Sequence, residues 1–275
     1  MHRASLTRVG FAARAIAVVA LAVAGCTSDP TKEASSVEPR STKDASPASA
    51  ASAASAASAA SQLAIVDGRS NTWTARDGTV VSFVVVVPPT RQIGEAGRVL
   101  LAFPPGGQDL DLTDQLVDEY WRDEALVRGW VVVSPAAPVT GLWYTDDTAA
   151  LLPAFLDSIE ATFPPTDGTF DLAGVSNGGL SGFRATLDHP ERFRSMVLFP
   201  GAPPSDTTDE QFAALDAIDI TLIVGGDDAS WLQGSQLAHD RLAAIGIDSE
   251  LVVVPGEGHI IQSLTAAQLW DALDP

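Results

Sequence analysis

The sequence predicts a three-layer α/β fold with a mostly parallel sheet and an antiparallel hairpin at its N-terminal end. Short β-rich runs that are apolar throughout recur after residue 62 and alternate with segments of helical periodicity. Runs that are apolar on both faces are typical of strands buried in a parallel sheet. Alternating strand and helix patterns indicate a sheet covered by helices on both faces. The 275-residue chain is 46% apolar, and residues 62–275 suit one domain of roughly 210 residues.

The N-terminus has the pattern of a secretory signal over residues 1–25. A basic start precedes an apolar run at 15–24, and such a run is too short to cross a bilayer core of about 30 Å. Val23-Ala24-Gly25-Cys26 resembles the bacterial lipobox, in which cleavage precedes a cysteine that then carries lipid. The pattern predicts a secreted, palmitate-bearing lipoprotein held at the outer side of a membrane of the bacterial cell envelope. The alternative is an ordinary signal peptide with an incidental cysteine.

Residues 26–61 are expected to form a tether. From residue 27 onward they hold no aromatic side chain, and from residue 48 they repeat Ser-Ala-Ala. Such a stretch cannot bury enough apolar surface to offset the entropy of ordering it. A low-complexity insertion without a role is the alternative. Cys26 is the only cysteine, so an intrachain disulfide is impossible.

The charge of the chain disfavours several classes of partner. The formal net charge is −19, which repels phosphate backbones and does not suit polybasic docking on anionic lipid. The histidines are scattered and show no metal-ligand spacing. We therefore expect no nucleic acid, no metal and no cofactor.

The expected strands begin with a hairpin. Residues 72–76 and 79–87 flank Asp77-Gly78, which is a hairpin turn signal. The runs expected in the parallel part of the sheet are 99–103, 130–133, 170–173, 196–199, 221–224 and 251–254.

Besides the helical stretch that follows residue 176, four helices are expected between and after these runs. Residues 112–127 place apolar side chains on one face and end at Gly129, and residues 231–245 end at Gly246. A further helix runs from about residue 263 to the end. Another covers 151–159, where Pro153 must either kink the helix or lie in its first turn.

Gly174-Val175-Ser176-Asn177-Gly178 is the strongest motif in the chain. This G-x-S-x-G pattern follows the run 170–173 and precedes a helical stretch, which is the strand–turn–helix context of a serine nucleophile. A sharp turn presses the residues two before and two after the serine against their neighbours, so Gly174 and Gly178 suit it. An incidental serine in a glycine-rich turn is the alternative.

An acid and a histidine follow the serine in the chain order that a serine nucleophile on such a turn requires. Asp227 and Asp228 come directly after the run 221–224, and His259 comes after 251–254. Both loops belong to the carboxyl edge of the sheet, where open α/β sheets bind ligands. His259 is the candidate general base, and a carboxylate would orient it. The residues alone leave Asp227 and Asp228 open.

Two backbone amides are expected to stabilise an oxyanion. One is the amide of Asn177 at the start of the helix. The other comes from the loop after 99–103, Pro104-Pro105-Gly106-Gly107-Gln108, in which either Gly106 or Gly107 could donate. A plain Pro-Gly turn is the alternative reading of this loop.

Together these features resemble the α/β-hydrolase superfamily over about residues 72–273. Within it, the segments 188–193 and 254–259 are similar to small secreted esterases of the polyhydroxybutyrate-depolymerase and feruloyl-esterase kind. The resemblance implies Ser176 as nucleophile, His259 as base and Asp228, three residues after a glycine, as orienting acid. The Pro-Pro-Gly-Gly loop and the lack of disulfides depart from many relatives. About twenty residues separate 199 from 221, so no large cap domain is expected.

The leading functional hypothesis is a serine carboxylester hydrolase that acts on a small or polymeric ester through an acyl-enzyme. A peptidase or an envelope acyltransferase with the same residues is a second hypothesis. A tethered, non-catalytic binding module on a hydrolase scaffold is a third. Trp143, Tyr144 and Trp231 could line the site, or could belong to the core.

Overall fold

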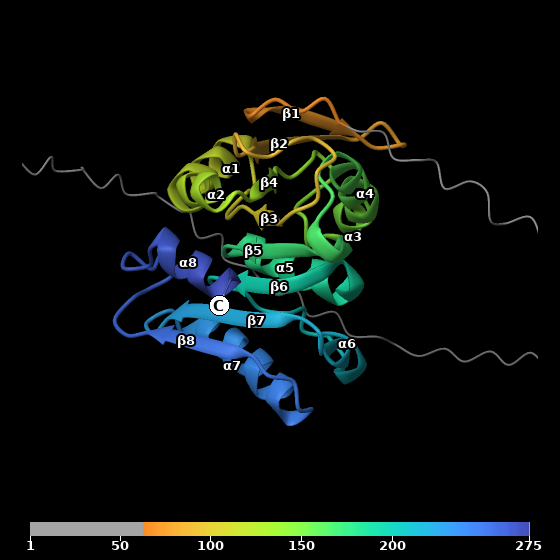
Figure 1. The fold of residues 1–275 in the computed structure, drawn as a ribbon. Coiled ribbons are helices and arrows are strands. Elements are labelled where there is room, and N and C mark those ends of the chain that lie inside the picture. Colours follow the sequence, from red (N-terminus) through yellow and green to blue (C-terminus); the bar gives the residue numbers. More distant parts are fainter. Residues whose placement is uncertain (1–62, 275) are drawn as a thin grey trace, which may run out of the picture. The chain divides into compact units, whose positions relative to one another are not determined.

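A computed structural model describes residues 63–274 of the chain (Figure 1). The predicted signal peptide, Cys26 and the tether lie outside the described residues. Within 63–274, no helix combines the length and the apolar character that crossing a membrane requires.

The centre of the described region is an eight-stranded sheet in the order β1-β2-β4-β3-β5-β6-β7-β8. The hairpin strands β1 and β2 are antiparallel, β2 also pairs antiparallel with β4, and every other pair is parallel. This confirms the predicted fold class. The strands are β1 (Gly68–Thr74), β2 (Val80–Val86), β3 (Val99–Phe103), β4 (Val131–Pro135), β5 (Phe170–Gly174), β6 (Phe193–Leu198), β7 (Asp219–Gly225) and β8 (Glu250–Val254).

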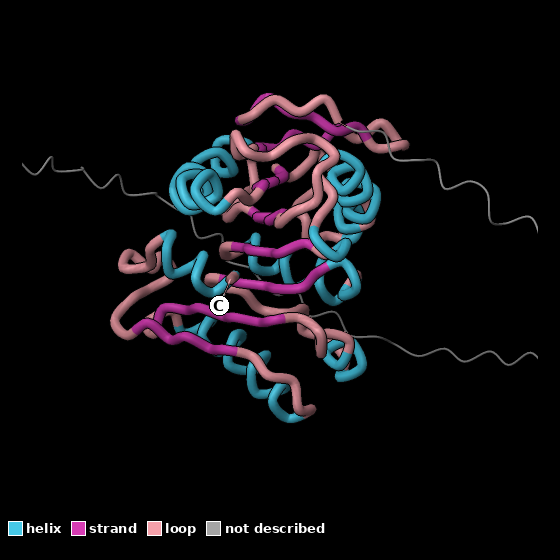
Figure 2. Tube along the Cα trace, in the orientation of Figure 1, coloured by secondary structure: helices cyan, strands magenta, loops and turns pink. Residues whose placement is uncertain are grey.

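Helices cover both faces of the sheet, which makes three layers (Figure 2). Apolar side chains of α4, α5, α6 and α7 pack on one face, and those of α1, α2 and α8 pack on the other. The α-helices are α1 (Leu110–Leu116), α2 (Arg122–Arg128), α3 (Asp146–Ala149), α4 (Leu152–Thr162), α5 (Asn177–Asp188), α6 (Asp209–Ala213), α7 (Ala229–Ala244) and α8 (Ala266–Leu273).

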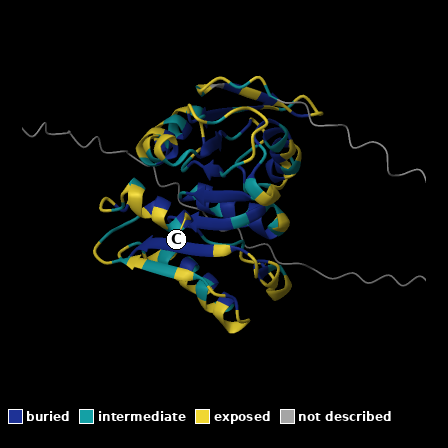
Figure 3. Ribbon diagram, in the orientation of Figure 1, coloured by how far each residue is buried: buried dark blue, intermediate teal, exposed yellow. Residues whose placement is uncertain are grey.

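The burial of the strands follows their place in the sheet (Figure 3). Every residue of β3, β4 and β5 is buried, as expected for strands covered on both faces. β8 is the last strand of the sheet and is only partly buried. β6 begins at Phe193, three residues before the predicted run. The prediction began too late because the polar residues Arg194 and Ser195 interrupt the apolar pattern.

The helix predicted over 112–127 is not one regular α-helix, and this expectation was wrong in detail. A π-helical turn, η1 (Val117–Trp121), separates α1 from α2. The extra residue of a π turn changes which side chains face inward. Trp121 is fully buried and makes edge-on contacts with Phe199 and Trp270. Gly129 ends α2 with a φ of 77°, as the sequence predicts.

Pro153 lies in the first turn of α4, where a missing amide hydrogen costs nothing. Helix α6, which lies between β6 and β7, was not predicted. Thr208 caps this helix in a reciprocal arrangement with Gln211, a spacing that could have revealed it. Since α6 is so short, the segment between β6 and β7 contains no cap domain, as predicted.

A buried ion pair between Arg98 and Asp171 connects the amino ends of β3 and β5. Asp171 of β5 is fully buried and accepts two hydrogen bonds from Arg98, at 2.7 and 2.8 Å, and one from Ser195 at 2.6 Å. Arg98 also lies over the ring of Trp130, 3.9 Å from its centroid, and donates to the carbonyl of Leu273. The pair therefore connects the sheet to the end of α8, at the opposite ends of the strands from the candidate site.

Candidate active site

Ser176 occupies a sharp turn between β5 and α5. Its φ of 56° and ψ of −114° are unusual for a residue with a side chain. The turn is held by a hydrogen bond of 3.0 Å from the Ser176 amide to the carbonyl of Pro200. A strained turn at the carboxyl end of a parallel strand is the strand–turn–helix geometry in which a serine nucleophile is found.

The glycines of the motif are required by close packing. A Cβ atom on Gly174 would lie 2.2 Å from the carbonyl oxygen of Gly178, and one on Gly178 would lie 2.1 Å from the carbonyl oxygen of Phe103. Neither contact can be relieved by moving a side chain, because the opposing atoms belong to the backbone. A residue with a side chain at either position would therefore force the backbone of this turn to move.

Ser176, His259 and Asp228 form one hydrogen-bonded chain. His259 Nε2 lies 2.9 Å from Ser176 Oγ, and His259 Nδ1 lies 2.7 Å from Asp228 Oδ2. Asp228 follows β7 and is the N-cap residue of α7. Asp227 is exposed, and its amide donates to the carbonyl of Glu257. The carboxylate that contacts the imidazole thus belongs to Asp228.

Glu257 organises the loop that carries His259. Its carboxylate accepts hydrogen bonds from the amides of Ser263, at 3.1 Å, and Gln262, at 3.0 Å. Hydrogen bonding from the Ser263 side chain, followed by the amide bonds from Gln262 and Ser263, favours the ionised form and lowers the pKa of Glu257 below its ordinary value. Because the Glu257 carbonyl also accepts from Asp227, the loops after β7 and β8 are joined.

The three aromatic residues considered for the site lie in different surroundings. The Trp231 ring faces the imidazole of His259, with 5.5 Å between centroids and 34° between planes. Trp143 is buried and packs against Phe103 and Phe155, so it belongs to the core. Tyr144 is half-buried.

The two candidate sources of oxyanion donors lie next to each other. The Asn177 side chain donates a 2.8 Å hydrogen bond to the carbonyl of Gly106, which has a φ of +58°. The backbone amides of Asn177, Gly106 and Gly107 donate no hydrogen bond to any backbone carbonyl of the described residues. In a planar trans peptide the C=O and N–H bonds point in opposite directions. The Gly107 amide therefore points away from the Asn177 side chain.

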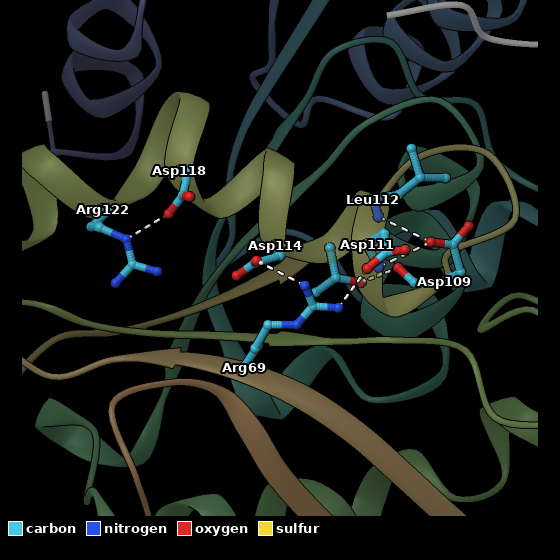
Figure 4. A network of polar contacts seen from close by, with 8 residues as sticks. Arg69, Asp109, Asp111, Leu112, Asp114, Asp118 and Arg122 are labelled. Carbon is cyan, nitrogen blue, oxygen red and sulfur yellow. Dashed lines mark hydrogen bonds and ion pairs between the residues drawn. The ribbon is translucent and has the colours of Figure 1, made fainter.

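The helix that follows this loop is firmly capped (Figure 4). Asp109 accepts hydrogen bonds of 3.0 Å from the amides of Asp111 and Leu112 at the start of α1. Arg69 of β1 pairs with Asp111 and Asp114 of the same helix. The cap and the ion pairs hold α1 in place directly after the glycine loop.

No metal site accompanies these groups in the part of the chain that the structure describes. Within residues 63–274, no three His, Cys, Asp or Glu side chains are grouped so that they could hold an ion.

Comparison with known proteins shows similarity at the level of the fold. No family model and no curated protein matches the sequence. Among solved structures, a thermostable esterase has a TM-score of 0.57 at 15% identity, covering 67% of this chain and 53% of its own length. An acetyl xylan esterase from Aspergillus awamori has a TM-score of 0.54 at 12% identity, covering 70% and 93%. A ferulic acid esterase has a TM-score of 0.52 at 15% identity, covering 74% and 94%.

At these identities the likeness shows the fold. The chain spans about half the length of the thermostable esterase. The sheet order, the serine turn after β5 and these similarities together show that residues 63–274 have the α/β-hydrolase fold.

Proposed function

We propose that the chain is a serine hydrolase that cleaves carboxylic esters through an acyl-enzyme. The observation that carries the proposal is the hydrogen-bonded chain from Ser176 Oγ through His259 to Asp228, which begins on a strained turn. Hydroxyl, imidazole and carboxylate in this order are the groups that nucleophilic acyl transfer needs.

In the first half-reaction Ser176 Oγ attacks the ester carbonyl carbon while His259 Nε2 takes the hydroxyl proton. Asp228 holds Nδ1–H and stabilises the imidazolium that forms. The carbonyl oxygen becomes an oxyanion, which the amides of Asn177 and Gly106 stabilise. His259 then passes its proton to the departing alkoxide, so an alcohol leaves and the acyl group stays on Ser176.

In the second half-reaction water takes the place of the alcohol. His259 removes a proton from water, and the hydroxide attacks the acyl carbon through a second oxyanion. When this intermediate collapses, the proton returns from His259 to Ser176 Oγ. The products are a carboxylic acid and the free enzyme.

Esters are the favoured substrates because three proteins of similar fold are named as esterases, one of them for acetyl xylan and one for ferulic acid. A peptidase or an acyltransferase would use the same three side chains. Incubation with a peptide substrate, and ester turnover with alcohol in place of water as acceptor, separates these outcomes through the products formed.

The decisive test replaces the nucleophile. Ser176→Ala should reduce hydrolysis of p-nitrophenyl butyrate by about 10⁴-fold or more, and a fluorophosphonate should label Ser176 in the wild-type chain. Ser249→Ala is a matched control, because Ser249 contacts His239 rather than the candidate site. Undiminished turnover by folded Ser176→Ala would refute the proposal, and a wild-type chain with no label on Ser176 would favour a binding module instead.

We further propose that the mature chain is lipid-anchored through Cys26 and faces the outside of the membrane. The basis is the signal-like pattern and the Val23-Ala24-Gly25-Cys26 tetrapeptide. Radiolabelled palmitate should be incorporated by the wild-type chain in a bacterial host and not by Cys26→Ser. Equal labelling of the two chains would contradict the anchor while leaving the proposed chemistry untouched.

A further inference from the structure

Gln108 is a buried amide at the end of the glycine loop. It has no exposed surface, and its φ of 53° is in the left-handed region. Its backbone amide closes the loop with a 3.0 Å hydrogen bond to the carbonyl of Pro105. A buried polar side chain on a strained residue costs stability unless its hydrogen bonds compensate.

The side-chain amide of Gln108 has partners that define its orientation. Nε2 donates to the carbonyl of Pro104 at 3.1 Å and to Ser181 Oγ at 3.0 Å, while Oε1 accepts from the amide of Trp143 at 2.9 Å. Rotating the amide by 180° would set two donors against each other at Trp143 and two acceptors against each other at Pro104. Both Nε2 protons are thus used, and only one orientation satisfies them.

These bonds belong to a closed network that joins the two sources of oxyanion donors. Ser181 Oγ, which accepts from Gln108, donates to the carbonyl of Asn177 at 3.0 Å. The Asn177 side chain in turn donates to Gly106 in the loop that Gln108 closes. The connection therefore runs from the glycine loop through Gln108 and Ser181 to the start of α5, and returns to the loop through Asn177.

Gln108 also connects this network to the loop that follows β4. Its carbonyl accepts a 2.6 Å hydrogen bond from the amide of Ala137, and its side chain accepts from Trp143. Segments that follow β3, β4 and β5 are thereby joined at one residue. A fully satisfied buried network of this kind makes its surroundings rigid.

We propose that Gln108 is a positioning residue that sets the spacing between the amide donors of Gly106 and Asn177. The proposal rests on the proposed function, because it assigns those amides to an oxyanion. Oxyanion donors act over 2.7–3.1 Å, so a small displacement weakens them. A loop with two adjacent glycines has little intrinsic stiffness, and the bonds of Gln108 supply it.

Asn71 provides a matched control for a merely structural role. It is also a buried amide with three side-chain hydrogen bonds: one from the Val66 amide at 2.8 Å, and two to the carbonyls of Val66 at 2.7 Å and Gly68 at 2.9 Å. It belongs to β1, at the opposite edge of the sheet from β8. Loss of either amide should lower the melting temperature, whereas only loss of Gln108 should disturb oxyanion binding.

The test compares Gln108→Met with Asn71→Leu in the full chain. We measure the melting temperature, kcat and KM for p-nitrophenyl butyrate, and the inhibition constant of an alkyl trifluoromethyl ketone, which forms a tetrahedral oxyanion on a serine. Gln108→Met should lower kcat by about 10- to 100-fold with KM changed less than about threefold. The ketone should bind more weakly by the factor that kcat/KM loses. Asn71→Leu should keep kcat and ketone binding within about twofold of wild type.

Wild-type kcat and ketone binding in folded Gln108→Met would overturn the proposal, and so would an equal loss of kcat in Asn71→Leu. If Gln108→Met does not fold, Ser181→Ala decides, because it removes one link of the network. Its kcat should fall about 3- to 10-fold, and an unchanged kcat would overturn the proposal. A wild-type chain that neither hydrolyses the ester nor reacts at Ser176 would instead refute the proposed function.

Discussion

His259 and Trp231 face each other ring to ring, with 5.5 Å between their centroids. Trp231 lies in the first turn of α7, the helix that begins at Asp228. The start of one helix therefore carries both the carboxylate that bonds to Nδ1 and the aromatic ring beside the imidazole. An aromatic face stabilises a nearby cation by about 0.5–2 kcal/mol, and in the proposed mechanism His259 is a cation in the transition state.

Replacing Trp231 should therefore slow acyl transfer. Trp231→Leu should lower kcat by about 2- to 30-fold, the kinetic equivalent of that interaction, and Trp231→Phe should retain part of it. Steady-state kinetics with a small ester, in which little of the effect comes from substrate contacts, measure the loss. Wild-type kcat in Trp231→Leu would show that the ring contact has no part in the chemistry.

The two neighbouring acids should respond differently to neutralisation. Asp228→Asn leaves a side chain of the same shape but removes the charge beside Nδ1, so kcat should fall by about 10⁴-fold. Asp227 is exposed, and its hydrogen bond to Glu257 is made by its backbone amide. In Asp227→Asn, kcat should therefore stay within about twofold of wild type. The same ester assay serves for both variants. A larger loss of kcat in Asp227→Asn than in Asp228→Asn would show that Asp227 is the acid that orients His259.

Gly178→Ala should be severely destabilising. The added methyl group would lie 2.1 Å from the carbonyl oxygen of Phe103, so the strand or the helix must move, at a cost of about 3 kcal/mol or more. Gly258→Ala is the control, because a Cβ atom there meets open space. Urea denaturation gives both free energies of unfolding, and equal values would refute the packing argument.

Breaking the buried ion pair should cost more stability than breaking an exposed one. Arg98→Met leaves the fully buried Asp171 without its main partner, and unfolding should become easier by about 3–5 kcal/mol. Arg122→Met breaks only the exposed pair with Asp118 and should cost less than about 1 kcal/mol. Denaturation midpoints at constant m-value report the difference. Similar midpoints would contradict the larger cost assigned to the buried pair.

Glu257 should contribute to acid sensitivity. Its pKa in the folded chain is lowered by the bonds from Ser263 and Gln262. Its contribution is therefore complete above its ordinary pKa and is lost as the pH falls through the lowered value. Melting temperatures of wild type and Glu257→Gln between pH 3 and 7 should differ most at the upper end and converge toward the acid end. A difference that is constant over this range would contradict the linkage.

Local patterns predicted most of the elements that carry the candidate site. The apolar runs located β3, β5 and β7 closely, because a strand buried on both faces leaves few polar positions. The π turn at 117–121 and the short helix α6 were missed. The π turn depends on where Trp121 can be buried against Phe199 and Trp270, and those contacts come from distant parts of the chain.

The residues along the chain are enough to predict the fold class, the strand–turn–helix motif around Ser176, and the order in which an acid and a histidine follow it. These features depend on neighbours along the chain and on the order of the strands. Three other findings come from the folded structure. Asp228 rather than Asp227 contacts His259, Trp143 belongs to the core while Trp231 faces the imidazole, and Gln108 joins three segments. Each of these depends on the direction of a side chain, which is set by contacts with residues far away in the sequence.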